Sequence, residues 1–91
     1  MNKIEQKMID ISRKLEVPTN LIRDVSKIEV ISNDTVIIEN HKGILNLDDT
    51  EIHINCGDLI VKIFGFNLVL GAISQTDILI VGNITNIDFL R

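Results

Sequence analysis

The feature that most constrains this chain is an alternation of apolar and polar residues that begins at Ile28 and runs almost to the end. In an extended strand every second side chain points to the same face, so such runs are typical of half-buried strands. Clusters rich in Ser, Asn, Asp and Gly separate the runs, and these residues favour turns. Strand starts recur about every eight to ten residues, which favours an antiparallel meander or a small sandwich.

The alternation predicts seven strands and one more in the C-terminal tail. The seven are Lys27–Ser32, Thr35–Glu39, Gly43–Asp48, Glu51–Asn55, Leu59–Phe64, Asn67–Leu70 and Ile78–Val81, and the tail strand is Ile84–Phe89. The chain holds 18 isoleucines but no tryptophan or tyrosine, and β-branched aliphatic side chains suit a pleated surface better than a helix. Segments 60–63 and 78–81 are apolar on both faces, which indicates a sheet covered on both sides by an N-terminal helix or a partner chain. A short β-solenoid is the alternative, although the strand spacing is uneven for one.

The N-terminal segment has a different period and predicts a helix over residues 3–16. Its apolar residues recur three and four positions apart and form one stripe, made of Met1, Ile4, Met8, Ile11 and Leu15. The helix is expected to end at Val17-Pro18, because proline disfavours helical backbone in the residue before it. Residues 1–17 are therefore assigned to an amphipathic helix and residues 27–91 to the β body of a single domain, 1–91. The stripe could cover its own sheet, pair with another chain or lie on a membrane surface.

Charge and cysteine content restrict the partners and the compartment. Residues 1–27 hold six basic and four acidic groups, whereas residues 28–91 hold three basic and nine acidic groups. The acidic body repels phosphate, so nucleic acid is not an expected partner. A single Cys56 excludes an internal disulfide, and neither a signal peptide nor a membrane span is evident. We therefore expect a cytoplasmic protein with at most peripheral membrane contact.

The candidate recognition site is a polar segment that separates two apolar runs. It consists of Glu39, Asn40, His41, Lys42 and Gly43. Its composition predicts a hairpin loop, since Asn and Gly tolerate left-handed backbone. The structural interpretation is a plain turn, and the functional one is an exposed loop that binds a protein partner, a role that loops on rigid sheets often have.

No group of residues predicts catalysis, a cofactor or a metal. His41 and His53 are the only histidines, and neither lies in a nucleophile or phosphate-binding motif. Cys56 has no basic neighbour in the sequence that would activate its thiol. A calcium or magnesium hypothesis rests on three carboxylates, those of Asp48, Asp49 and Glu51. Their segment fits a solvated turn better, because it lacks the pattern of a calcium-binding loop.

Three blocks of the chain support a family resemblance. They are Leu15-Glu16-Val17-Pro18, Ile37-Ile38-Glu39-Asn40-His41-Lys42-Gly43-Ile44-Leu45, and the stretch 78–88. In sequence, order and length the chain resembles the YabP/YqfC family of sporulation proteins, and its YqfC branch most. The resemblance implies a small protein of endospore-forming bacteria, made in the mother cell during sporulation and often encoded beside a membrane protein of the same process. It implies no biochemical activity, so no catalytic residue is transferred.

The sequence and the resemblance together predict a non-enzymatic assembly or adaptor factor of spore formation. Its expected partner is a protein, such as a sporulation membrane protein encoded nearby, and its expected place is the mother-cell cytoplasm or the forespore membrane. Sheet edges, the 39–43 segment or the N-terminal helix could carry the contact. The first alternative is a homo-oligomeric structural β protein of the spore envelope layers. A ligand-binding or metal-binding enzyme is the remaining alternative, and it rests only on His41 and the 48–51 carboxylates.

Overall fold

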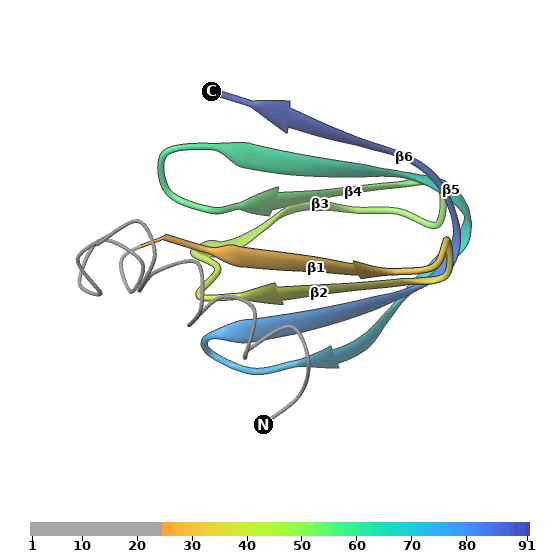
Figure 1. Cartoon of the computed structure of the whole chain (residues 1–91), viewed down its shortest axis with the longest axis horizontal. Coiled ribbons are helices and arrows are strands. Elements are labelled where there is room, and N and C mark those ends of the chain that lie inside the picture. Colours follow the sequence, from red (N-terminus) through yellow and green to blue (C-terminus); the bar gives the residue numbers. More distant parts are fainter. Residues whose placement is uncertain (1–24) are drawn as a thin grey trace, which may run out of the picture.

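The computed structural model describes residues 25–91, which form one six-stranded antiparallel sheet in the order β1-β2-β6-β5-β4-β3 (Figure 1). The strands are β1 (Lys27–Ile31), β2 (Thr35–Glu39), β3 (Gly43–Leu47), β4 (Glu51–Asn55), β5 (Ile60–Ile73) and β6 (Asp77–Leu90). The first four strands have five residues each, whereas β5 and β6 have 14 residues each and form one long hairpin. The remaining strands are therefore arranged around this hairpin.

Both long strands bend sharply near their middle, at the right-hand side of Figure 1. Each bend contains a glycine at which the two strands approach too closely for a side chain. A Cβ on Gly65 would lie 2.0 Å from the Asn83 backbone oxygen, and a Cβ on Gly82 would lie 2.8 Å from the Leu68 Cα. Gly82 also has a φ of +150°, a conformation that side chains rarely adopt.

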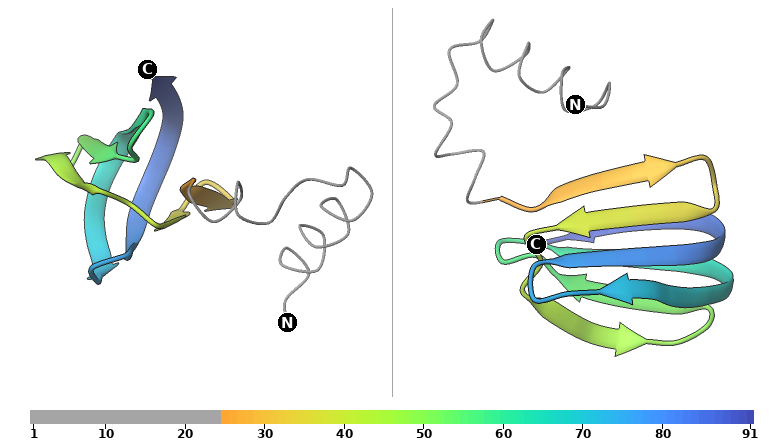
Figure 2. Two further views of the ribbon diagram at one scale, coloured as in Figure 1. Left: turned by 90° about the vertical axis from the view of Figure 1, so that its left-hand side faces the viewer. Right: turned by 90° about the horizontal axis from the view of Figure 1, so that it is seen from below.

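The bends divide the sheet into two layers. Layer A consists of β1, β2, residues 77–81 of β6 and residues 69–73 of β5, whose strands lie side by side in the right panel of Figure 2. Layer B consists of β3, β4, residues 60–64 of β5 and residues 86–90 of β6. Because β5 and β6 continue through both layers, the bend carries the hydrogen-bonded ladder from one layer into the other.

One core lies between the layers. In β2 and β4 every second residue is buried, as expected for strands with one face inward. The buried residues of both layers form a single cluster: Val36, Ile38, Ile52, Ile54, Cys56, Val61, Ile63, Leu68, Ile78, Ile80 and Ile84. Full burial of a valine or isoleucine stabilises a fold by about 1.5–3 kcal/mol, so this aliphatic cluster supplies most of the driving force for closing the two layers.

Two turns hold the bends in place through backbone hydrogen bonds. In the turn between β1 and β2, the Asn33 oxygen accepts from the Ile84 amide at 2.7 Å, and the Asp34 oxygen accepts from the Gly82 amide at 3.1 Å. In the turn between β3 and β4, the Asp49 oxygen accepts from the Leu68 amide at 2.8 Å. At each bend, backbone amides that have no partner in the neighbouring strand thus donate to a backbone oxygen of a nearby turn instead.

The structure corrects the predicted fold class. The chain is mainly β in its described part, but the sheet is not a simple meander, because β2 pairs with β6 instead of β3. It is one folded sheet and not two separate ones, and all its pairings are antiparallel, which excludes the solenoid alternative. The predicted strands 59–64 and 67–70 are one strand, as are 78–81 and 84–89. The predicted helix, residues 1–17, lies outside the described residues.

Candidate interaction surface

The outer face of layer A is apolar around its centre. Residues directly opposite each other in neighbouring strands point to the same face. Ile37 is opposite Leu79, and Val81 is opposite Val69. These pairs alternate along the strands with the pairs that face the core, so they point outward. Val69 is 53% exposed, and Ile31 at the end of β1 is 46% exposed. These five residues form what we call the outer apolar face: Ile31, Ile37, Val69, Leu79 and Val81.

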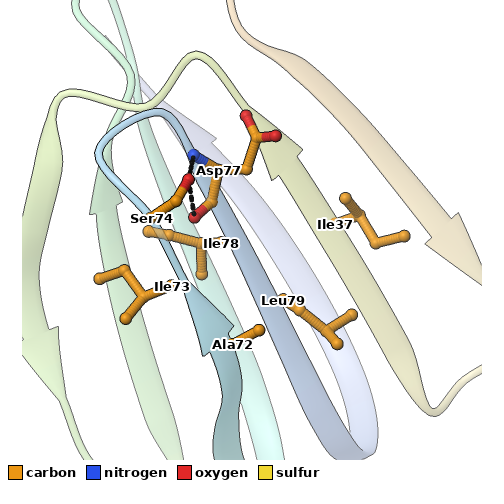
Figure 3. A pocket seen from close by; sticks show the side chains of 7 residues that line it. All are labelled: Ile37, Ala72, Ile73, Ser74, Asp77, Ile78 and Leu79. Atoms are coloured by element: carbon orange, nitrogen blue, oxygen red, sulfur yellow. Dashed lines mark hydrogen bonds between the residues drawn. The ribbon is translucent and has the colours of Figure 1, made fainter.

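A shallow hollow of about 290 Å³ adjoins this face at the turn between β5 and β6 (Figure 3). Its lining residues come from β2, β5, β6 and that turn: Ile37, Ala72, Ile73, Ser74, Asp77, Ile78 and Leu79. Ser74 closes the turn, since its hydroxyl oxygen accepts from the Asp77 amide at 2.9 Å. The hollow is therefore aliphatic with one carboxylate at its rim, which suits an apolar side chain of a partner better than a polar ligand.

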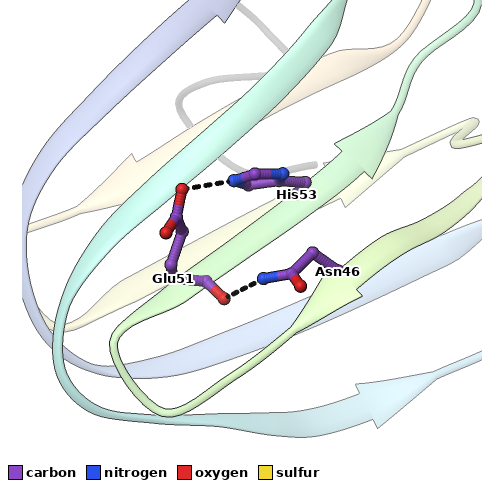
Figure 4. Close-up of polar contacts among 3 residues, drawn as sticks. All are labelled: Asn46, Glu51 and His53. Carbon is purple, nitrogen blue, oxygen red and sulfur yellow. Dashed lines mark hydrogen bonds and ion pairs between the residues drawn. The ribbon is translucent and has the colours of Figure 1, made fainter.

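The outer face of layer B is different, because polar side chains occupy its centre. His53 on β4 lies opposite Lys62, which in turn lies opposite Asp88 on β6. His53 Nε2 and Glu51 Oε1 are 2.6 Å apart, and the Asn46 amide donates to the Glu51 backbone oxygen at 3.0 Å (Figure 4). Glu51 thus contacts both His53 and Asn46 on this outer surface. Ile60, Phe64 and Leu90 lie on either side of this polar centre. Of the two layers formed by residues 25–91, layer A is thus the one whose outer face has an apolar centre.

The predicted recognition segment 39–43 is a crossover between the layers and not a hairpin loop. It leaves β2 in layer A and enters β3 in layer B, and these strands are not neighbours. The His41 amide donates to the Thr76 oxygen at 3.0 Å, and the Lys42 amide donates to the Asn55 oxygen at 2.7 Å. Asn40 has a φ of 63° at the turn out of β2. The predicted left-handed backbone is thus present, although it serves a different connection.

His41 braces this crossover with both ring nitrogens. The Gly43 amide donates to Nδ1 at 3.0 Å, so Nδ1 carries no proton. Nε2 then carries the proton and donates it to the Ser74 oxygen at 3.1 Å. A neutral imidazole with both nitrogens engaged by backbone is suited to holding the crossover against the β5–β6 turn.

Of the five predicted residues only Lys42 is exposed, whereas Glu39, Asn40, His41 and Gly43 are half-buried. Their binding role stays a prediction.

The other polar candidates lie apart from this crossover. The carboxylates of Asp48, Asp49 and Glu51 lie at the turn into β4, where the Asp48 amide donates to the Glu51 oxygen at 3.0 Å. Among residues 25–91 no three His, Cys, Asp or Glu side chains are grouped as they would be to hold a metal ion. Cys56 is a free thiol in the core. Within the same residues no helix has the length and apolarity to cross a membrane.

Sequence reasoning predicted that segment 78–81 is apolar on both faces, but it did not identify the other residues of the outer apolar face. Segment 78–81 is apolar at consecutive positions, and the structure places Ile78 and Ile80 in the core and Leu79 and Val81 outside. Val69 lies in a similar run, Leu68-Val69-Leu70, but its place on this face depends on how β5 bends.

The fold and this surface define a small antiparallel β protein with one apolar outer face. Comparison with known proteins adds one relative. The chain is 29% identical over 81 residues to the uncharacterized protein YqfC of Bacillus subtilis (strain 168), and the aligned region covers 89% of this chain and 87% of that protein. No family model matches the chain, and no solved structure matches it. The similarity supports a YqfC-like relationship.

Proposed function

We propose that this protein is a non-enzymatic assembly or adaptor factor of spore formation that binds a protein partner through the outer apolar face of layer A. The observation that carries the proposal is the contrast between the layers. Both have the same core-facing pattern, yet only layer A has an aliphatic outer centre, with Ile31 and Val69 about half exposed. Exposed apolar patches beside polar surroundings are typical of interaction sites.

The sporulation setting rests on the resemblance to the YabP/YqfC family, and the similarity to YqfC of Bacillus subtilis supports it. The proposed place of action is the mother cell, at the forespore membrane, with a membrane protein of the same process as the partner. Glu29, Glu39 and Asp77 lie beside the apolar centre on the same outer face, with the basic Lys27 opposite Glu39. The acidic excess of this face favours a partner segment with apolar side chains flanked by basic ones.

The test is a fluorescent fusion of the full chain in sporulating cells, with and without the membrane-protein gene that lies beside its own gene. We expect a ring around the forespore that disperses when that gene is deleted. Val69→Lys should disperse the ring too, whereas Leu45→Lys, a substitution of an equally exposed residue on β3, should leave it intact. Diffuse fluorescence of the wild-type fusion in both strains would contradict the proposal.

The alternative is a structural protein of the spore envelope layers in which many copies stack edge to edge. The observation that favours it is the set of exposed apolar residues on unpaired strand edges, such as Val30 and Phe89, at 49% and 61% exposure. Light scattering at increasing concentration tests this alternative, since stacking should give species that grow without limit.

A further inference from the structure

Four strand segments of residues 25–91 have a neighbour on one side only. They are β1, β3, residues 66–73 of β5 and residues 84–90 of β6. The β5 and β6 segments are edges because β4 pairs only with residues 60–64 of β5 and β2 only with residues 77–81 of β6. Unpaired backbone groups along an edge can pair with another strand, so each segment is a potential interaction site.

Bulges separate these four edges into two kinds. The register of β3 shifts between Ile44 and Asn46, and that of β5 shifts between Leu70 and Ala72. Such bulges disrupt the ladder and protect an edge from pairing. The pairing of β1 with β2 runs without a shift over all five residues, and so does the pairing of residues 86–90 of β6 with β5. Only β1 and the end of β6 are regular edges.

The two regular edges lie on the same flank of the molecule. A cavity of about 320 Å³ brings the start of β1 close to the end of β6. It is lined by Val25 and Ser26 before β1, Ile28 in β1, Lys42 of the crossover, residues 56–59 and Arg91 after β6. Within residues 25–91 no further strand covers the core along this β1/β6 flank. Val30 is opposite the buried Val36 and is 49% exposed, and Phe89 is opposite the buried Val61 and is 61% exposed. A covering group on this flank would bury both side chains.

Each regular edge is complementary to itself in the antiparallel direction. If β1 pairs with β1 of a second copy about a twofold axis at Ile28, Lys27 lies opposite Glu29 of the second copy. If β6 does the same about Ile87, Asn86 lies opposite Asp88 of the second copy. The Asn86 amide donates to Asp88 of its own chain at 2.9 Å, and its second amide hydrogen can donate to Asp88 of the second copy. Opposite charges and amide–carboxylate pairs at directly opposed positions stabilise a sheet, whereas like charges destabilise it. In neither of these two arrangements do two carboxylates lie opposite each other, although residues 28–91 have an excess of acidic groups.

We infer that a second copy of this chain occupies the β1/β6 flank and forms a twofold dimer in which both layers continue from one copy into the other. The interface is isologous, so Val30 and Phe89 of each copy are covered by the same surface of the other. The inference stands apart from the proposed function, since a dimer can form whether or not a membrane partner binds layer A.

Sedimentation velocity of the full chain over a wide concentration range tests the dimer. We expect twice the mass of the 10.2 kDa chain, with Phe89→Lys and Val30→Lys sedimenting as monomers where the wild type is dimeric. Leu47→Lys is the matched control, because Leu47 is 55% exposed and core-facing but lies on the bulged edge of β3. It should remain dimeric. Melting curves of all variants at equal concentration check that they fold.

A cross-linking experiment tests the register. In a Cys56→Ser background, the pair Asn86→Cys with Asp88→Cys should give a covalent dimer on oxidation, whereas Leu45→Cys with Leu47→Cys should not. A wild-type monomer at all concentrations overturns the inference, and so do species that grow beyond a dimer. A monomer whose Phe89→Cys thiol resists alkylation overturns it as well, because the flank is then covered by the chain itself.

Discussion

Gly65 provides the sharpest test of how the sheet bends. In the Gly65→Ala variant the new methyl group would lie 2.0 Å from the Asn83 oxygen and 3.1 Å from the Ile84 Cα, both of them backbone atoms. Backbone cannot turn aside as a flexible side chain can, so the two long strands must separate at the bend. Overpacking in a close-packed site costs about 1–3 kcal/mol, and we expect this variant to reach about 3 kcal/mol. For a domain of this size that lowers the Tm by roughly 12–24 °C.

The assay is urea and thermal unfolding followed by far-ultraviolet circular dichroism, because the chain has no tryptophan or tyrosine to serve as a fluorescence probe. Gly71→Ala is the control, since its methyl group would meet only the Leu79 side chain at its closest contacts, 3.3 and 3.4 Å. That side chain can move, so the free energy of unfolding should fall by less than about 1 kcal/mol. Equal stability of the two variants would refute the view that close approach at Gly65 creates the bend.

Four further substitutions separate the core, the outer apolar face, the crossover and the polar face by the same unfolding assay. Ile80→Ala removes a fully buried side chain and should lower the free energy of unfolding by about 2–5 kcal/mol, whereas Ile31→Ala on the outer face should cost far less. His41→Ala removes both ring hydrogen bonds of the crossover and should cost about 1–2 kcal/mol, and a loss near zero would contradict the bracing role. Glu51→Gln weakens a partly exposed contact to His53 and should change stability by less than about 1 kcal/mol.

The local part of the fold was predictable from the sequence, because it depends on short-range alternation. The predicted strands Thr35–Glu39 and Glu51–Asn55 have the bounds that the structure shows. The inward positions within them, such as Ile38 and Ile52, are fully buried. The long strands were not predictable in this way. A glycine inside an alternating run indicates either a turn or a bend, and only pairing between distant residues decides which one forms.

The 39–43 segment was misinterpreted for the same reason. Asn40 and Gly43 do have positive φ values, so the local conformation fits a turn. Whether such a turn joins two neighbouring strands is a property of the sheet order. Here residues 77–81 of β6 occupy the place beside β2 that a hairpin would give to β3. No pattern within residues 35–47 contains that information, and so the crossover and the role of His41 in it could be found only from the structure.

A dimer through the β1/β6 flank also determines where the two outer apolar faces point. Opposite residues of an antiparallel pair point to the same face, so a twofold axis perpendicular to the sheets leaves both A layers on one side of the dimer. The dimer then presents two binding faces in parallel to a partner that is itself paired or concentrated in a membrane. Linked sites raise the effective concentration of the second contact, and avidity can exceed single-site affinity by about 10²–10⁴-fold.

Phe89→Lys should therefore weaken the forespore ring without altering layer A, whereas Val69→Lys should abolish the ring and leave the dimer intact. If Phe89→Lys were monomeric and the ring kept its full strength, the two surfaces would be independent and the avidity argument wrong.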